Sequence, residues 1–399
     1  MGKTGLSIFY KEVRNINLII YEDSNSIFYF GIRGCLGGLP TFNRNCNFID
    51  INDALRDKRL EKLSDYATSL SYIVLETNDN VLIDEKSVCY LGFVGENILV
   101  ADSEICHLFD SNGRFIKNIG RQGQGPGEYT SIRRVVVSSQ TQHIYISHNG
   151  LGILEYDTNG NYLQTILHES HLGAWAFMGE NIISDLPNYR GDNPYMFAVL
   201  NQSGDTIAKI PNNDFFKLSG RPLMFANEPF YFYKGQMNYY RLFNDTVYNI
   251  QQETGKLLPI FRFQSTSHSV SKDLRSDAAK FATSDHDYII PWSIIETENH
   301  LFINALRNQI GLINFLYDKQ KKSFYQLASS AESQHGISND IDEGLPFFPD
   351  YKLNHHLVCM MIPAYDILEH IKYNPAFSNI LFSNLTEESN PVIVILHLK

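Results

Sequence analysis

The chain has 399 residues, of which 43% are hydrophobic and 13% aromatic, so it can bury a sizeable core. Charged residues make up only 19%, a share that argues against a disordered or coiled-coil protein. The formal net charge of -11, without any basic block, excludes a nucleic-acid surface because phosphates would be repelled. The longest apolar runs are too short to span a membrane, so no transmembrane segment is expected.

The N-terminal segment, residues 1–46, matches no pattern in the rest of the chain, and we predict that it is unassigned or disordered. Ile32, Gly34 and Cys35 faintly resemble the cleavage box of a bacterial lipoprotein. Arg33 and the short apolar run before it do not fit that box. The export route is therefore left open by this segment.

Between residues 91 and 210 one pattern recurs: short apolar strands joined by tight turns, with a Gly-containing turn before the last strand of each copy. The turns Asp110–Gly113, Asp157–Gly160 and Asn201–Gly204 follow one another at intervals of about 45 residues. Gly and Asn suit such turns because they adopt a positive φ at little steric cost. A period of this length with several short strands per unit is typical of a β-propeller.

Three further copies are less regular, and they are interrupted by helical-looking insertions at 271–283 and 365–380. Their predicted strands lie at 230–233, 239–243, 246–250 and 260–263, then at 301–305, 312–317 and 324–327, and finally at 357–362 and 391–398. We predict the innermost strands of the first four blades at 91–94, 132–137, 175–178 and 224–226. These segments are nearly free of carboxylates.

The sixth copy lacks an outer strand, because the chain stops at Lys399. Residues 70–76 (LSYIVLE) alternate apolar and polar and have no other evident partner. Pairing of 70–76 with 391–398 would leave no open edge, and open edges are aggregation sites. We therefore predict an all-β fold: a lead-in segment at 47–69, then a six-bladed β-propeller at 70–399 that an N-terminal strand completes.

A glycine-rich segment, Gly120–Tyr129, follows the outer strand of the first copy. It is not a P-loop, because Pro126 stands where Lys is required, and Glu128 replaces the third glycine of a dinucleotide fingerprint. We interpret it as the crossing from the first blade to the second, with a positive φ at Gly125. No nucleotide or other cofactor is predicted.

Several separated motifs occur in order: Phe48-Ile-Asp-Ile-Asn-Asp, Gly123-Gln-Gly-Pro-Gly-Glu-Tyr129, Asn244-Asp-Thr-Val-Tyr248 and Asn390-Pro-Val-Ile-Val394. Together they resemble a six-bladed β-propeller family (NHL-like) of Bacteroides-type bacteria, over about residues 48–399. The resemblance implies a secreted or lipid-anchored protein, periplasmic or at the cell surface, whose biochemical role is undefined. This sequence has no clear signal peptide, in contrast to what the family implies.

No catalytic or metal-binding residue is predicted. The candidate metal ligands His168/His171, Asp285-His286-Asp287 and His355-His356 each lack a local third or fourth partner, and the five cysteines have no CxxC spacing. There is no G-x-S-x-G elbow for nucleophilic catalysis. Tyr231, Phe232 and Tyr233 with Tyr239 and Tyr240 would suit sugar stacking, but strand aromatics more often pack between blades, and we favour that interpretation.

We therefore expect a non-catalytic binding or scaffolding protein, a monomer whose ligand is a peptide, a glycan or a partner protein. The alternative is a metal-dependent enzyme similar to propeller lactonases or lyases, which would need acidic, Asn or His side chains on several innermost strands. In a propeller the inter-blade loops and the turns within blades emerge on one face, where side chains can converge. This nominates Arg121, Gln122, Glu128, Asp102, His148, Asn149, Tyr189 and Arg190 as ligand-binding residues, the alternative being that all are solvated loop residues.

Overall fold

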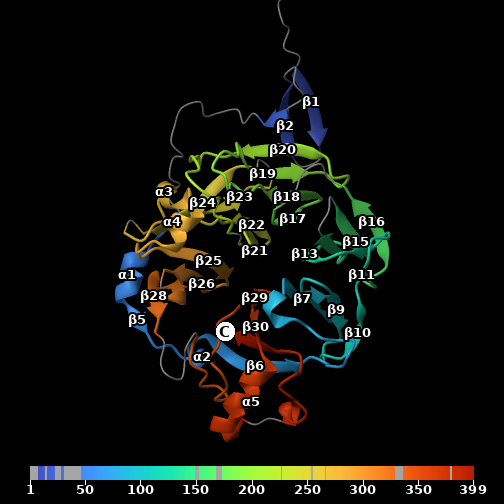
Figure 1. The fold of residues 1–399 in the computed structure, drawn as a ribbon, viewed down its shortest axis with the longest axis vertical. Helices are drawn as coiled ribbons and strands as arrows, with labels where there is room; N and C mark the ends of the chain where they lie inside the picture. The colour runs from blue at the N-terminus through green and yellow to red at the C-terminus, as the bar shows by residue number, and fades with distance from the viewer. Residues whose placement is uncertain are drawn as a thin grey trace, which may run out of the picture. The chain divides into compact units, whose positions relative to one another are not determined.

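The computed structural model describes residues 46–148, 152–167, 173–225, 227–252, 255–265, 267–308, 310–328, 336–377 and 380–399, and the backbone of 8–13, 16–22 and 28–30. The chain divides into two compact units. Unit one comprises Met1–Asn52, His168–Ser293 and Leu306–Gly311, and unit two comprises Asp53–Leu167, Ile294–Ala305 and Leu312–Lys399. Six sheets of four or five strands are the blades of a six-bladed β-propeller, which confirms the predicted fold (Figure 1).

Blades one and two belong to unit two and follow the predicted pattern closely. Blade one consists of β7 (Tyr90–Val94), β8 (Asn97–Ala101), β9 (Cys106–Phe109) and β10 (Phe115–Asn118), and blade two of β13 (Ile132–Val137), β14 (Ile144–His148), β15 (Ile153–Tyr156) and β16 (Tyr162–Ile166). The middle strands β9 and β15 are buried along their whole length, whereas the outer strands β10 and β16 are largely solvent-accessible. This difference explains why the middle strands are mostly apolar, with His107 and Glu155 as buried polar exceptions, and the outer ones mixed.

Blades three and four contain most of the strands of unit one. Blade three consists of β17 (Trp175–Met178), β18 (Asn181–Asp185), β19 (Tyr195–Leu200) and β20 (Thr206–Pro211), and blade four of β21 (Phe230–Tyr233), β22 (Gln236–Tyr239), β23 (Thr246–Ile250) and β24 (Leu257–Gln264). The predicted innermost strand at 224–226 is wrong, because β21 holds that position. Lys234 and Gly235, both at positive φ, form a two-residue turn, so β21 and β22 are the first hairpin of the blade.

Blades five and six carry the predicted insertions. Blade five consists of β25 (Ile289–Glu296), β26 (His300–Arg307), β27 (Gly311–Asp318) and β28 (Ser323–Leu327), preceded by α3 (Lys272–Arg275) and α4 (Ala278–Ala282). Blade six consists of β29 (Tyr351–Lys352), β30 (Leu357–Ile362), β31 (Val392–Leu398) and β6 (Ala67–Val74), with α5 (Ala364–Tyr373), η2 (Pro375–Phe377) and η3 (Ile380–Phe382) between β30 and β31. Within unit two, α5 projects beyond β6 (Figure 1).

The N-terminal strand β6 completes blade six, as predicted. It pairs antiparallel with β31 over seven residue pairs, from Val392↔Val74 to Leu398↔Ala67. Asn390 adds a second fastening: its Oδ1 accepts from the Ile83 amide (2.9 Å), and its Nδ2 donates to the carbonyls of Glu76 (2.7 Å) and Val81 (2.8 Å). Since Asn390 is only 2% exposed, these bonds are shielded from water.

The lead-in segment contributes two strands that the sequence analysis does not predict. β4 (Asn47–Asp50) pairs parallel with β24 at the outer edge of blade four, and β5 (Lys58–Arg59) pairs parallel with β28 at the outer edge of blade five. The short helix α1 (Ile51–Arg56) lies between β4 and β5, and α2 (Leu63–Tyr66) lies between β5 and β6. Residues 47–74 thus extend three successive blades.

The glycine-rich segment forms the crossing from blade one to blade two. β11 (Arg121–Gln122) and β12 (Glu128–Tyr129) pair parallel, and the Tyr156 hydroxyl donates to the Gly127 carbonyl (3.0 Å). The predicted positive φ at Gly125 is wrong: Gly120 (69°) and Gly127 (71°) adopt it, and Gly125 does not. The reversals of the chain therefore lie at the two ends of the segment.

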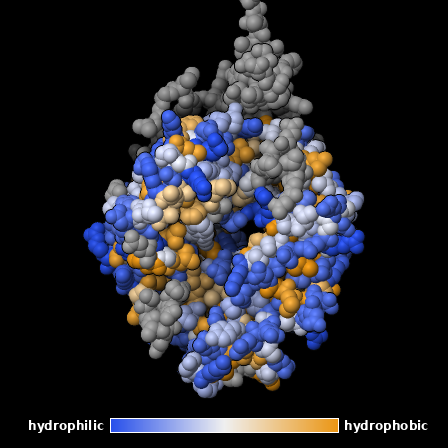
Figure 2. All heavy atoms as spheres, viewed as in Figure 1, coloured by the Kyte–Doolittle hydropathy of each residue, from blue (hydrophilic) through white to orange (hydrophobic). Residues whose placement is uncertain are grey.

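Tight cores join adjacent blades within each unit. In unit two, Leu99, Tyr129 and Ile146 share a core between blades one and two, and in unit one Ile183, Phe197 and Tyr239 share a core between blades three and four. On the face seen in Figure 2, hydrophobic and hydrophilic residues are interspersed. The helices of the described part of the chain all lack the length and apolar character of a membrane span.

The N-terminal segment is described only in part. The backbone of β1 (Ile8–Val13), β2 (Ile16–Glu22) and β3 (Phe28–Phe30) forms an antiparallel sheet in that order. The predicted cleavage box at Cys35 lies outside the described residues. A 3-10 turn, η1 (Glu85–Ser87), leads from the closing strand to blade one.

Candidate functional site

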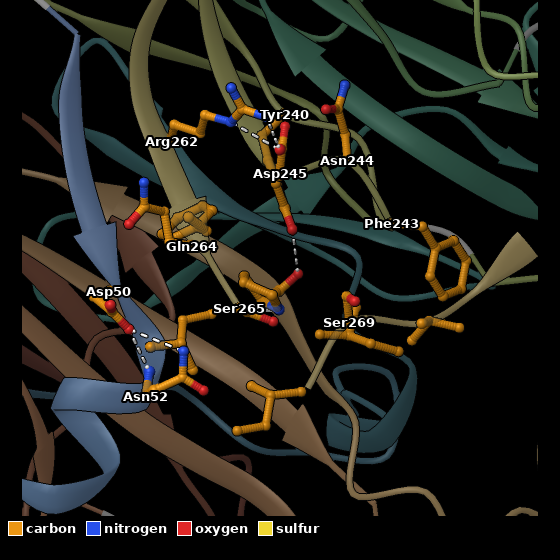
Figure 3. Close-up of a pocket in the computed structure, with 16 residues that line it drawn as sticks. Asp50, Asn52, Tyr240, Phe243, Asn244, Asp245, Arg262, Gln264, Ser265 and Ser269 are labelled. Carbon is orange, nitrogen blue, oxygen red and sulfur yellow. Dashed lines mark hydrogen bonds and ion pairs between the residues drawn. The ribbon is translucent and has the colours of Figure 1, made fainter. Parts of the chain in front are cut away.

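A pocket of about 540 Å³ lies in unit one, between the outer strands of blade four and the start of β25 (Figure 3). Half of its lining is polar and half apolar, in the following residues: Asp50, Ile51, Asn52, Tyr240, Phe243, Asn244, Asp245, Arg262, Phe263, Gln264, Ser265, Ser269, Val270, Ile289, Ile290 and Pro291. Its volume falls within the range of about 300–1,000 Å³ that is usual for ligand pockets.

One side of the pocket is formed where β4 runs into α1. Asp50, the last residue of β4, accepts through Oδ1 from the Asn52 amide (2.8 Å) and from Asn52 Nδ2 (3.1 Å). The Ser267 hydroxyl in turn donates to Asn52 Oδ1 (2.5 Å). This turn fixes the Asp50 and Asn52 side chains at the rim of the pocket. The turn is positioned by the parallel pairing of β4 with β24.

Across from this turn, Arg262 and Asp245 form an ion pair (Figure 3). Asp245 Oδ2 accepts from Arg262 Nε (2.8 Å) and lies 2.8 Å from Nη2, and Oδ1 accepts from the Thr246 hydroxyl (2.6 Å). The Asp245 carbonyl accepts from the Phe263 amide (2.7 Å), which holds the loop before β23 against β24. The pair therefore joins two segments of blade four at the pocket wall.

The apolar wall is built on buried aromatic side chains. The Tyr240 hydroxyl donates to the Pro291 carbonyl (3.2 Å) and its ring meets Phe263 edge-on, and burial raises the pKa of Tyr240 well above its ordinary value. Phe243 lies at a φ of 66°, a conformation that is costly for a bulky residue. Its ring stacks on Phe225, with centroids 6.4 Å apart.

Two polar groups in the pocket have no partner within the described ranges. The Gln264 amide is exposed, and the Ser265 hydroxyl is half-buried; neither makes a side-chain hydrogen bond there. Convergent donors and acceptors of this kind fix the orientation of a ligand. The arrangement is suited to binding.

The predicted residues of the first inter-blade loop lie together in unit two. Arg121 Nε donates to Glu128 Oε1 (2.6 Å), and Glu128 Oε2 accepts from the Gly125 amide (2.9 Å). These bonds, the Gly125 amide first, lower the pKa of Glu128. Gln122 is exposed beside them on β11. Arg121 and Glu128 thus engage each other, and the Arg121 side chain remains 79% exposed.

The predicted residues in the turns within blades one and two have different surroundings. Asp102 is buried; its carboxylate accepts from the amides of Asp84, Glu104 and Ile105, an arrangement that shapes the turn. His148 ends β14, and its buried Nδ1 has no hydrogen-bond partner in the structure as described; burial lowers the pKa of this imidazole. Asn149 lies outside the described residues.

Tyr189 and Arg190 lie in unit one, in the loop between β18 and β19. Tyr189 is half-buried, and burial, with the Asp185 carboxylate, raises the pKa of its hydroxyl. Arg190 is exposed. Convergence of the eight predicted residues on one face stays a prediction, because they are divided between the two units.

The candidate metal ligands are engaged in other ways. Arg307 binds the Asp287 carboxylate through Nε (2.8 Å) and Nη2 (2.6 Å), and His286 contacts the Ser269 carbonyl through Nε2 (3.0 Å). His168 and His171 lie outside the described residues, and His355-His356 is an exposed turn. Across the ranges that the structure describes, no three His, Cys, Asp or Glu side chains come together.

None of the pocket residues is among the ligand-binding residues predicted from the sequence. Two signals could have found them, because the pocket lies where the motifs Phe48-Ile-Asp-Ile-Asn and Asn244-Asp-Thr-Val-Tyr248 meet. The two motifs are almost two hundred residues apart, and only the pairing of β4 with β24 brings them together.

The blades and the pocket together define a six-bladed β-propeller with a ligand-sized cavity at its fourth blade. The model of the family described as "Domain of unknown function (DUF4934)" matches residues 46–397, and the chain belongs to this family. The predicted resemblance to a six-bladed propeller family of Bacteroides-type bacteria with an undefined role is thereby confirmed. Among curated proteins, none matches the chain.

Two solved structures share the fold over most of their length. A Bacteroides fragilis protein described provisionally as exported is 18% identical, with a TM-score of 0.68, over 89% of this chain and 99% of its own. A member of the DUF4221 family from Bacteroides vulgatus is 11% identical, with a TM-score of 0.50, over 84% of this chain and 97% of its own. At these identities the likeness concerns the fold alone.

Proposed function

We propose that the protein is a non-catalytic binding or scaffolding protein, a monomer that acts outside the cytoplasm and holds a peptide, a glycan or a partner protein at the pocket of blade four. The observation that carries the proposal is the pocket itself. It has the volume of a ligand site, and the Gln264 amide and the Ser265 hydroxyl are available to a ligand. Two of the motifs that carry the family resemblance supply Asp50, Asn52, Asn244 and Asp245 of its polar lining.

Two facts support a place outside the cytoplasm. The structurally similar Bacteroides fragilis protein is described as exported. The motifs that resemble the propeller family of Bacteroides-type bacteria also imply a secreted or lipid-anchored protein. Fractionation of the native host, with the protein detected in the periplasmic or surface fraction, tests this part of the proposal.

A pocket-filling variant tests the site. Ser265→Trp would occupy the cavity, and Ser139→Trp, at an exposed turn of blade two, is its matched control. In a thermal-shift screen of glycans, peptides and small molecules, ligands should raise the Tm of the wild type and of Ser139→Trp but not of Ser265→Trp. A ligand at about 100 times its Kd stabilises by about 2.7 kcal/mol, a readily measured shift. Equal shifts in all three proteins would contradict the proposed site.

The loop residues predicted from the sequence offer a second location for the same function. A double variant, Arg121→Ala with Arg190→Ala, removes the two exposed guanidinium groups that could grip a carboxylate or stack on a ring. If the double variant loses the ligand and Ser265→Trp keeps it, the site lies at these loops. If the double variant keeps the ligand, both arginines are excluded from the site.

A further inference from the structure

The charged groups of the pocket are satisfied within the pocket wall. Both oxygens of Asp245 accept hydrogen bonds, one from Arg262 and the other from Thr246. Asp50 accepts two bonds from Asn52 through one oxygen. A charged ligand would have to compete with these existing pairs and lose its strong hydration, whereas a neutral polar ligand would not compete with the pairs and would lose much less hydration free energy.

The other polar groups of the lining are neutral. They are the side-chain amides and hydroxyls of Asn52, Asn244, Gln264, Ser265 and Ser269. A primary amide presents a donor and an acceptor side by side in one plane, and a hydroxyl can do either. Such groups match pairs of adjacent hydroxyls, each of which also donates and accepts.

Phe243 contributes to the pocket lining an aromatic ring that is held in a fixed position. Its ring is stacked on Phe225, meets Phe281 edge-on (centroids 6.5 Å apart), and lies 4.9 Å from the Arg275 guanidinium. A ring that is already immobilised loses little entropy when a ligand covers it. The C–H face of a pyranose ring is apolar and suits contact with the apolar residues of the lining, which also include Ile51, Tyr240 and Phe263.

We infer that the pocket binds a neutral saccharide unit, an inference that rests on the proposed function and names its ligand class. The main alternative ligand is a peptide. Proteins usually bind peptides at a strand edge, in an extended apolar groove, or by capturing a charged terminus. The lining combines neutral side-chain amides and hydroxyls with two carboxylates that already accept hydrogen bonds, one guanidinium, three aromatic rings and five aliphatic residues. The neutral amides and hydroxyls of the lining recognise the hydroxyl groups of a saccharide better than they recognise a peptide backbone.

The test is calorimetric titration of the full chain against cellotriose, maltotriose, xylotriose and mannotriose, preceded by a printed array of neutral glycans. Trigalacturonic acid is the charged comparison, and acetyl-trialanine amide is the peptide comparison. Trp292 follows Pro291 of the pocket and provides a fluorescence readout, which Trp292→Phe should abolish. At least one neutral glycan should bind, and both comparison compounds should bind at least tenfold more weakly.

Two variants with matched controls link binding to the pocket. Gln264→Ala removes an exposed amide, with Gln140→Ala on blade two as its control. Phe243→Gly removes the ring while glycine tolerates the positive φ, with Lys322→Gly, at a φ of 52°, as the control for that backbone relief. Each pocket variant should weaken binding about tenfold, or about 1.4 kcal/mol, and each control should not.

The outcomes separate the inference from the proposed function. If acetyl-trialanine amide binds in a Gln264-dependent manner and no glycan does, the saccharide inference is overturned while the pocket remains a binding site. If a neutral glycan binds equally to the wild type, Gln264→Ala and Phe243→Gly, both the inference and the proposed site are overturned. If no glycan of the array binds, the inference fails.

Discussion

Blades one to three and blades four to six are built from different parts of the chain. Each of the first three blades consists of four strands that follow one another in the sequence. Each of the last three also receives a strand from residues 47–74: β4, β5 and β6, respectively. The pocket lies where the first of these added strands ends. The comparison shows that the regular four-strand repeat builds the scaffold. The strands added from residues 47–74 complete the last blade and form one side of the candidate site.

The largest expected effect comes from removing the added strands. Deleting residues 1–77 removes β6 and exposes the edge of β31, so cooperative unfolding should be lost. Deleting residues 1–46 should leave the unfolding transition unchanged, and deleting 1–52, which also removes β4 with its four residue pairs and the first two residues of α1, should lower stability partially. Urea unfolding followed by circular dichroism measures all three. Identical unfolding transitions for the variants that lack residues 1–46 and 1–77 would refute the role of β6 in completing blade six.

The next largest effect concerns the three side-chain hydrogen bonds of Asn390. Asn390→Ala leaves the Ile83 amide and the carbonyls of Glu76 and Val81 without their buried partner, at about 1–3 kcal/mol for each unsatisfied group before relaxation. We expect a loss of about 3 kcal/mol in the free energy of unfolding. Asn201→Ala, in an exposed turn of regular blade three, should lose about 1 kcal/mol or less. Similar losses for both variants would show that closure does not depend on Asn390.

A smaller effect distinguishes two glycines of the crossing between blades one and two. At Gly127 (φ 71°) an added Cβ would lie 2.6 Å from the Tyr162 ring, so Gly127→Ala should lower stability by about 2 kcal/mol. At Gly125 the nearest atom would be the end of the Glu128 side chain, at 3.1 Å, and φ is not positive. Gly125→Ala should therefore change stability little. The reverse order of the two melting temperatures would contradict this description of the crossing.

The smallest effect is a pH dependence in regular blade two. Glu155 is 7% exposed; burial alone would raise its pKa, but hydrogen bonds from His143, Gln164 and Tyr145 outweigh burial and lower it below the ordinary 4.5. A lowered pKa in the folded state means that ionised Glu155 stabilises the fold above pH 4.5, and that this contribution is lost as the pH falls through the lower folded value. Urea titrations from pH 7 to pH 3 should show the advantage of the wild type over Glu155→Gln shrinking below pH 4.5. A constant difference in stability between the wild type and Glu155→Gln over this pH range would contradict the lowered pKa of Glu155 in the folded state.

Much of this architecture follows from the sequence, because hairpin turns and apolar runs are local signals. The Gly-containing turns at Gly113, Gly160 and Gly204 adopt the positive φ that their pattern predicts. β4 and β5 could not be predicted, because strands of four and two residues carry no measurable period and are fixed by partners far along the chain. The innermost strand of blade four cannot be located from the sequence, because 224–226 and 230–233 are both short and apolar. The pocket cannot be predicted from the sequence for the same reason as β4. Its polar residues come together only through the pairing of strands that lie far apart in the chain.

The added strands have a consequence for the time course of folding. The Asn47 side chain bonds to Ile260 across 213 residues, and Asn390 bonds to Glu76 across 314. β4 and β6 are therefore synthesised early and paired late: β4 must wait for β24 and β6 for β31. A nascent chain must carry β6 unpaired until nearly all of it has been made, with a long loop to close and an open sheet edge meanwhile. Blades one to three can assemble as they emerge, whereas the final blade must wait for the whole polypeptide.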